Sequence, residues 1–333
     1  MNDILHIKDL YVNFKTPFGI AKVLNGVTIS IGFQEVVSLV GETGCGKSIT
    51  AKSVLDVLPE TADVKGSIFI KNIDLLKSKK REKRKIVRTT VGYIPQNPMT
   101  SLNPVFTIGE IFTDLIKWQG YETISWKEYR KWKHRSQEKE KKKAIELLKK
   151  VHLPHPEEVL SKYPVQLSGG MRQRILIAMS MIGDREFLIA DEPTTALDVT
   201  IQKGIVELIK EKVKEEKLSV LYITHNLGVA RILSNKIYVM YAGDIVEYAD
   251  TAKLLNNPYH PYSKGLLDSI PKLIKTGFSG IPGRLPSYID PPKGCRFYPR
   301  CKKRLEICKT VKPPLIEVEK NHFVRCHLYE KNN

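Results

Sequence analysis

The chain has 333 residues, a formal net charge of +18 and five cysteines. At about 150 residues per domain, this length fits one large domain or two modest ones. A hydrophobic content of 42% excludes wholesale disorder. No stretch approaches the roughly 18 apolar residues needed to cross a bilayer, and no segment resembles a signal peptide, so we expect a cytoplasmic chain. The charge favours a polyanionic partner: nucleic acid, nucleotide or an anionic membrane surface.

Short apolar segments alternate with helical patterns along most of the chain. Strands are predicted over residues 36–40, 91–95, 187–191, 219–224 and 237–241. Helices are predicted from residue 47 onward, over 171–182 and over 199–216. Strands that alternate with helices predict an α/β fold with a largely parallel sheet covered on both faces.

Two regions break this alternation. Between Pro104 and Pro164 the strand signal disappears, and a lysine-rich helical insertion is predicted. After about Asn256, prolines punctuate a segment without long periodic elements. We interpret this segment as an extension that is held by something other than a large core.

A glycine-rich loop joins the first apolar strand to a helix and matches G-x-x-x-x-G-K-[ST]. Its backbone N–H groups and the helix N-terminus suit phosphate, Lys47 suits the β- and γ-phosphates, and the Ser48 hydroxyl suits Mg²⁺. Cys45 is expected to have no catalytic role but to be prone to oxidation, because helix N-termini lower thiol pKa values. The predicted phosphate-binding residues are Gly41, Glu42, Thr43, Gly44, Cys45, Gly46, Lys47, Ser48 and Ile49.

Two further motifs carry phosphate chemistry. The apolar strand over 187–191 ends in Asp191 and Glu192, which places Asp191 beside the metal and lets Glu192 polarise an attacking water. A second Gly-rich helix start consists of Leu167, Ser168, Gly169, Gly170 and Met171. One nucleotide does not need two such ends from one chain, so the second is expected to serve a nucleotide held by a partner subunit.

These motifs together resemble the ATP-binding subunits of ABC transporters, and within them the oligopeptide/dipeptide/nickel importer ATPases. LSGGM continues as RQR, with Met171 where most such proteins have Gln. QNPMTSLNP begins at Gln96 and has Asn97 in place of the usual Asp. DEPTTALD ends at Asp198, and THNLG contains His225 and has Asn226 in place of the usual Asp. The resemblance runs from about residue 4 to 328.

The resemblance implies a P-loop ABC-type nucleotide-binding domain over 1–255, with a RecA-like core, an antiparallel β edge and a helical subdomain at about 98–165. A small irregular extension would occupy 256–333. Phe14 lies where the family stacks an aromatic ring on adenine, with Tyr11 and Phe18 close by.

The resemblance also implies the mechanism. Two subunits would sandwich two ATP molecules, each between one phosphate loop and the partner's signature motif at 167–171. Glu192 would activate water, and His225 would hold that water and the γ-phosphate. Gln96 would sense the phosphate and join Ser48 and Asp191 at Mg²⁺. Asp198 would link the two sites.

The extension contains Cys295, Cys301, Cys308 and Cys326. Disulfides do not suit a reducing cytoplasm, and zinc modules usually bring C-x2–4-C pairs, which are missing here. Iron–sulfur clusters accept irregular spacing, and the family resemblance implies a [4Fe–4S] cluster. Zinc or free thiols remain the alternatives, with His322 and His327 as possible substitute ligands.

We therefore expect an ATP-hydrolysing motor of a peptide importer at the cytoplasmic face of the cell membrane. Its expected partners are a second, paralogous ATPase, two permease subunits and an extracellular binding protein. Nickel or oligosaccharide is the alternative cargo. A soluble ABC ATPase acting on nucleic acid or ribosomes is the alternative function, suggested by the charge and by lysine-rich runs at 77–85 and 127–143. The single phosphate loop weighs against it, and no nucleic acid is expected as partner.

Overall fold

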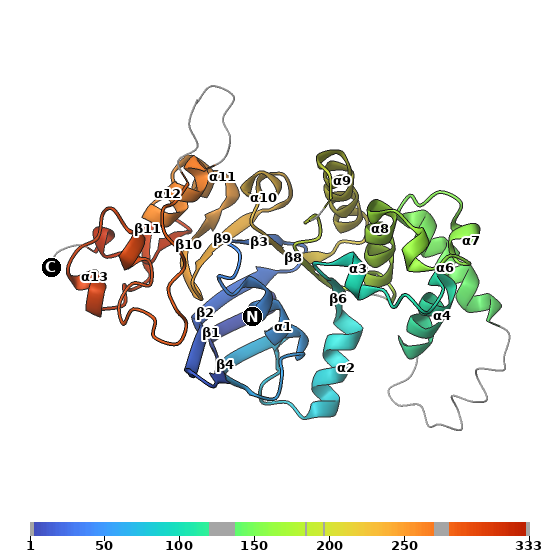
Figure 1. Ribbon diagram of the computed structural model, residues 1–333, viewed down its shortest axis with the longest axis horizontal. Helices are drawn as coiled ribbons and strands as arrows, with labels where there is room; N and C mark the ends of the chain where they lie inside the picture. Colours follow the sequence, from blue (N-terminus) through green and yellow to red (C-terminus); the bar gives the residue numbers. More distant parts are fainter. Residues whose placement is uncertain (1–2, 120–136, 184, 196, 270–279, 331–333) are drawn as a thin grey trace. The chain divides into compact units, whose positions relative to one another are not determined.

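The computed structural model describes residues 3–119, 137–183, 185–195, 197–269 and 280–330 (Figure 1). The chain divides into two compact units. The first joins Met1–Lys79 to Ser219–Asn333, and the second is Lys80–Leu218. The first unit thus combines both ends of the chain, and the second is a single segment inserted between them. Among the described residues, no helix is both long and apolar enough to cross a membrane.

The first unit contains an antiparallel sheet in the order β2-β1-β4-β5. Its strands are β1 (Asp3–Thr16), β2 (Gly19–Gly32), β4 (Ala62–Ile70) and β5 (Ile73–Asp74). Strands β1 and β2 form a hairpin whose register shifts several times, which indicates β-bulges. This sheet is the antiparallel β edge that the family resemblance implied.

A second, mixed sheet of the first unit has the order β11-β12-β10-β9-β3-β8. Strand β3 (Val36–Val40) pairs in parallel with β8 (Ser219–Thr224) and β9 (Lys236–Tyr241). All residues of β3 and β8 are buried, as expected for parallel strands covered on both faces. Strand β10 (Asp244–Asp250) is antiparallel to β9. The unit's helices are α1 (Lys47–Leu55), α10 (Leu227–Leu233), α11 (Thr251–Asn256) and α12 (Pro261–Asp268).

The C-terminal extension is built into this unit more firmly than the sequence predicted. Strand β12 (His322–Val324) pairs with β10, and β11 (Ile316–Glu319) pairs with β12. Phe297 and Cys301 are buried in one hydrophobic cluster with Tyr241 and Tyr262. The expectation of an extension held without a large core is therefore wrong, because its aromatic residues complete the core beside β9. Short helical turns η2 (Tyr298–Arg300), α13 (Ile307–Thr310) and η3 (His327–Tyr329) connect its parts.

The second unit contains a parallel pair of strands, β6 (Val91–Ile94) and β7 (Phe187–Asp191). In its described part, the region between Pro104 and Pro164 contains helices and no strand, as predicted. Part of the lysine-rich run at 127–143 lies outside the described residues. The helices are α2 (Lys80–Thr90), α3 (Pro98–Ser101), α4 (Ile108–Gln119), α6 (Glu138–Lys150), α7 (Pro156–Val159), η1 (Pro164–Gln166), α8 (Gly169–Ser180) and α9 (Val199–Glu215).

Candidate functional site

The phosphate loop of the first unit lies between β3 and α1, and the structure strongly favours glycine at two of its positions. A Cβ atom on Gly41 would lie 2.2 Å from the Met240 carbonyl oxygen. Gly46 has φ 113°, a left-handed conformation, and a Cβ there would lie 2.8 Å from Leu24. Strand β9 therefore packs directly against Gly41, whereas the left-handed backbone and the neighbouring Leu24 of β2 favour glycine at position 46.

Lys47 is held inside the loop. Its side chain is buried, and its ammonium group donates hydrogen bonds to the carbonyl oxygens of Gly41 (2.8 Å) and Glu42 (3.0 Å). Ser48 is half-buried, whereas Thr43 and Gly44 are exposed. The loop therefore holds the positively charged ammonium group of Lys47 next to a solvent-accessible stretch of backbone, which is the arrangement that phosphate binding requires.

Cys45 differs from the sequence-based expectation. The thiol is fully buried, and burial raises its pKa to about 11. A thiol with a raised pKa and no access to solvent is not a reactive thiolate. The predicted proneness to oxidation is therefore wrong, because desolvation outweighs the helix N-terminus and the Lys47 charge.

Three residues of the C-terminal half contact the loop, and no sequence motif predicts them. Arg300 forms an ion pair with the Glu42 carboxylate at 2.8 Å. The Tyr262 hydroxyl accepts a hydrogen bond from the Glu42 N–H at 2.9 Å, and the Tyr288 hydroxyl donates to the Gly44 carbonyl at 2.7 Å. No short motif links positions more than 200 residues apart, so only the fold reveals them.

The second unit brings together the predicted catalytic carboxylate and the glutamine. The parallel register of β6 and β7 places the ends of the two strands side by side. Gln96, just after β6, donates from its amide nitrogen to the Glu192 carboxylate at 3.2 Å. The Thr195 hydroxyl donates to the same oxygen at 3.0 Å. Glu192 is almost buried and has φ 45°, a conformation that non-glycine residues rarely adopt and that is concentrated at functional sites.

Asp191 ends β7 and is buried. Burial of the Tyr93 side chain, and to a lesser extent the negative charge of Asp191, raise the pKa of the Tyr93 hydroxyl to about 12. Tyr93 therefore stays protonated at neutral pH and donates a hydrogen bond to Asp191. This neighbour orients the carboxylate that the sequence analysis assigned to the metal.

The predicted signature motif opens α8. The Ser168 side chain caps this helix by accepting from the Met171 N–H at 3.3 Å, and Ser168 is exposed while Leu167 is buried. A Cβ on Gly170 would lie 3.0 Å from Ile201 of α9, which explains the second glycine of the motif. The exposed N-terminal end of a 12-residue helix is a suitable place for an anion.

Asp198 caps α9 in the same unit. Its carboxylate accepts from the Ile201 N–H at 2.9 Å, and its side chain is exposed. A negative charge at a helix N-terminus also interacts favourably with the helix dipole. The family resemblance implied a different role for Asp198, a link between the nucleotide sites of two subunits. The helix cap is an additional role within one chain.

His225 lies just after β8 in the first unit and is exposed. The next residue, Asn226, caps α10 by accepting from the N–H groups of Gly228 (2.9 Å) and Val229 (3.3 Å). Asn97 caps α3 in the same way, through the Met99 N–H at 2.9 Å. Both asparagines stand where the family usually has Asp, and an amide oxygen caps as well as a carboxylate does.

The aromatic residues proposed for adenine all lie in the β1–β2 hairpin region. Phe14 is half-buried and pairs in register with Ala21 and Ala62. Phe18 is 84% exposed in the hairpin turn, and Tyr11 is 39% exposed. Geometry alone does not choose among the three rings, so the adenine contact of Phe14 stays a prediction.

The four cysteines of the extension all belong to the first unit. All four are free thiols, and Cys301, Cys308 and Cys326 are buried. Burial raises the pKa of Cys295 to about 12 and of Cys326 to about 11, and the Cys308 thiol adds to both rises by electrostatic repulsion. The Cys295 N–H donates to the Cys308 carbonyl at 2.8 Å. The four side chains are thus close enough to influence one another.

No group of three or more His, Cys, Asp or Glu side chains among the described residues is arranged to hold a single metal ion. The zinc alternative for the cysteines therefore receives no support. His322 and His327, the possible substitute ligands, have other partners: Glu247 at 2.7 Å and Glu330 at 2.7 Å.

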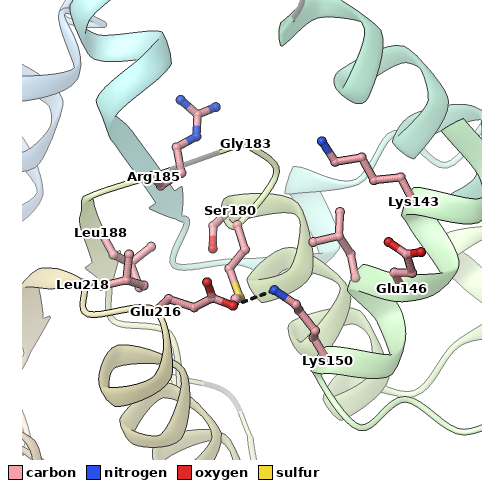
Figure 2. Close-up of a pocket in the computed structure, with 11 residues that line it drawn as sticks. Lys143, Glu146, Lys150, Ser180, Gly183, Arg185, Leu188, Glu216 and Leu218 are labelled. Carbon is pink, nitrogen blue, oxygen red and sulfur yellow. Dashed lines mark hydrogen bonds and ion pairs between the residues drawn. The ribbon is translucent and has the colours of Figure 1, made fainter.

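The second unit also contains a pocket of about 300 Å³ that is separate from the motif residues (Figure 2). Figure 2 shows the side chains of Lys143, Lys150 and Arg185 around it together with two carboxylates, and Lys150 pairs with Glu216 at 2.6 Å. None of the motif residues lines this pocket. It is therefore no part of the phosphate chemistry.

The strand–loop–helix with a buried lysine, the Asp-Glu pair after β7 and the capped glycine-rich helix start together define an ABC-type P-loop ATPase. Family comparison agrees. Residues 24–195 match the ABC transporter family, and residues 246–308 match the C-terminal region of oligopeptide/dipeptide transporters. The chain belongs to the ABC transporter family, within the group of dipeptide and oligopeptide transport ATP-binding proteins, and it hydrolyses ATP.

Individual relatives extend over the whole length. The dipeptide transport ATP-binding protein DppD of Caldanaerobacter subterraneus is 38% identical over 99% of this chain and 98% of its own. The oligopeptide transport ATP-binding protein OppD of Bacillus subtilis is 38% identical over 98% of this chain and 88% of its own. The ATP-binding cassette MJ0796, solved as a dimer with ADP and phosphate, is 27% identical with a TM-score of 0.63, covering 74% of this chain and 98% of that one.

Proposed function

We propose that this chain is the ATP-hydrolysing motor subunit of an ABC importer for di- or oligopeptides. The observation that carries the proposal is the full-length similarity to dipeptide and oligopeptide transport ATP-binding proteins, extension included. Nickel or oligosaccharide is the alternative cargo. The chain would act at the cytoplasmic face of the membrane with two permease subunits and a binding protein outside.

ATP would bind at residues 41–49, with Phe14 against the adenine. Lys47 lies in the loop where it can exchange its two carbonyl partners for phosphate oxygens. When bound, Mg²⁺ neutralises phosphate charge, and its proposed ligands are Ser48, Gln96 and Asp191.

Glu192 is the proposed general base, which takes a proton from the attacking water. Gln96 and Thr195 orient its carboxylate by hydrogen bonds, so a movement of Gln96 would change the orientation of the general base. His225 is proposed to hold the water and the γ-phosphate. His225 is exposed and directly follows β8.

The signature motif is proposed to bind a nucleotide held by a second subunit. Each chain has one phosphate loop and one capped glycine-rich helix start, so two chains would form two complete sites. The related cassette that is dimeric with ADP and phosphate supports this arrangement. Asp198, exposed beside α9, would link the sites, and the second subunit would be a paralogue.

We also propose three functional regions: a nucleotide-binding domain over 1–255, with a helical subdomain at about 98–165, and an extension over 256–333. The four cysteines of the extension are proposed to hold a [4Fe–4S] cluster. The relatives named above are described by transport and ATP binding, so this proposal rests on the four-cysteine pattern of Cys295, Cys301, Cys308 and Cys326 and on the family resemblance. The four thiolates of such a cluster bind different iron atoms and need not approach a single point.

A transport experiment tests the cargo. The chain would be reconstituted in vesicles with its permeases and its paralogue, and ATP hydrolysis measured with the binding protein loaded with dipeptide, oligopeptide or Ni²⁺. We expect stimulation by peptides. Stimulation by Ni²⁺ alone would contradict the peptide assignment, and strongly salt-dependent RNA binding without permease partners would favour the nucleic-acid alternative.

The variant Glu192→Gln tests the base. Removal of the general base is expected to lower ATP hydrolysis about 100-fold or more while ATP binding persists, and the closed dimer should accumulate. Thr195→Val, which removes only a partner of Glu192, is the milder comparison. If Glu192→Gln hydrolyses ATP at the parental rate, Glu192 is not the base.

Purification without oxygen tests the cluster. We expect a brown protein with broad visible absorbance and iron and sulfide in equal amounts, and loss of colour on replacing Cys308 by Ser. A colourless protein with one equivalent of zinc would contradict the cluster.

A further inference from the structure

The phosphate loop of this chain carries an acidic residue, Glu42, and the C-terminal extension neutralises it. Glu42 is the second residue of the loop, and its side chain is 28% exposed. A carboxylate at this place would repel the triphosphate that the proposed function requires. The surroundings of Glu42 therefore bear on nucleotide affinity.

Arg300 binds the Glu42 carboxylate with both ends of its guanidinium group. The two N···O distances are 2.8 and 3.1 Å, the bidentate geometry that makes arginine–carboxylate pairs strong. The arginine side chain is only 6% exposed, so water screens the pair little. Lysine could not reproduce both contacts.

The extension itself orients Arg300. The guanidinium donates to the carbonyl oxygens of Pro282 (2.9 Å) and Ile281 (2.9 Å), and its carbon lies 5.7 Å from the Tyr241 ring centre. These contacts hold the Arg300 side chain in position independently of its ion pair with Glu42. Its position depends on the fold of the extension rather than on the loop.

Two tyrosines hold the loop backbone beside this ion pair. The fully buried Tyr262 accepts from the Glu42 N–H, and Tyr288 donates to the Gly44 carbonyl. Tyr288 is in turn tied to β2, since the Lys22 N–H donates to its carbonyl at 2.7 Å. Because a peptide unit is planar, a fixed Gly44 carbonyl also fixes the direction of the Cys45 N–H.

We propose that Arg300 is a positioning residue of the nucleotide site: it draws the Glu42 carboxylate away from the phosphates and offsets its charge, while Tyr288 sets the loop backbone. The C-terminal extension is then part of the ATP-binding apparatus. This inference rests on the proposed ATP-binding role of the loop.

The test measures the affinity of the full-length chain for a fluorescent ATP analogue with Mg²⁺. Arg300→Ala is expected to weaken binding about tenfold, because the carboxylate is left unpaired in the loop. Tyr288→Phe, which loses only the hydroxyl, should weaken it about threefold. Arg304→Ala is the matched control, since Arg304 belongs to the same segment, is exposed and contacts Tyr298 rather than the loop.

A double-mutant cycle separates positioning from general damage. In a Glu42→Gln background no carboxylate remains, so Arg300→Ala should change the affinity less than threefold. An equal loss in both backgrounds, or no loss in either, overturns the proposal. If Arg300→Ala does not fold, Arg300→Lys is compared with Arg304→Lys, and an unchanged affinity again overturns it. Failure of the parent chain to bind ATP would instead refute the proposed function.

Discussion

A buried histidine at the start of α12 makes the stability of the first unit depend on pH below about 6.5. His260 is 1% exposed, and its Nδ1 accepts a hydrogen bond from the Tyr262 N–H at 3.0 Å. Accepting at Nδ1 requires a neutral ring, because both nitrogens of a protonated ring are donors. Burial lowers the pKa of His260 to about 4, although Glu247 and Asp244 oppose the shift.

The magnitude follows from the two pKa values. The unfolded chain binds a proton at His260 below about pH 6.5, whereas the folded chain binds it only below about 4. The unfolded state therefore gains protons first, and stability is lost as the pH falls between these values. Linkage gives a loss of about 1.4 kcal/mol by pH 5.5 and about 2 kcal/mol by pH 5.0, with a limit of about 3 kcal/mol.

Urea unfolding followed by circular dichroism at pH 7.5, 5.5 and 5.0 checks this number. His260→Asn keeps an acceptor for the Tyr262 N–H but cannot titrate, so the loss of unfolding free energy between pH 7.5 and 5.5 should shrink by about 1.4 kcal/mol. His155→Asn is the control, since His155 is exposed and has φ 47°, which asparagine tolerates. Glu247, whose pKa is lowered below 4.5 by hydrogen bonds that outweigh its burial, changes stability only at lower pH. Equal pH dependence of His260→Asn and the parent would refute the reasoning.

Two further substitutions test the loop and the interface residue. Gly41→Ala forces a Cβ onto the Met240 carbonyl, so it should abolish detectable ATP binding and destabilise the chain by about 2 kcal/mol or more, whereas Gly280→Ala, which meets nothing within 4 Å, should do neither. Asp198→Ala should cost about 1 kcal/mol by loss of the α9 cap, and Asp198→Asn should keep that stability; full ATPase activity in Asp198→Asn would contradict a role for its charge between the two sites.

The sequence predicts the elements whose residues are mostly apolar. Strands β3, β7 and β8 begin and end where expected, because every residue in each is buried and each forms a short, mostly apolar run. The predicted strand over 91–95 ends one residue early, at Ile94. The long strands β1 and β2 were expected only through the family resemblance, since their bulges and mixed exposure hide the two-residue period.

The site was predictable to the extent that its residues are neighbours in sequence. The loop glycines, Lys47 and the Asp-Glu pair each form a local motif with its own chemistry. The contact between Arg300 and Glu42 joins residues 258 positions apart and follows from the packing of the extension. Burial reversed the inference for Cys45, because position in a motif says nothing about how deeply a side chain lies.

The last two strands of the chain also protect the sheet from other chains. Strand β10 is almost entirely buried, and β12 and β11 cover its outer side, so the edge falls on β11. That edge strand has only four residues, an irregular register, and exposed Glu317 and Glu319. Short, charged and irregular edges resist pairing with foreign strands. A chain that ended near Asn257 would instead leave the longer, largely buried strand β10 as the unpaired edge, and we expect such a fragment to aggregate.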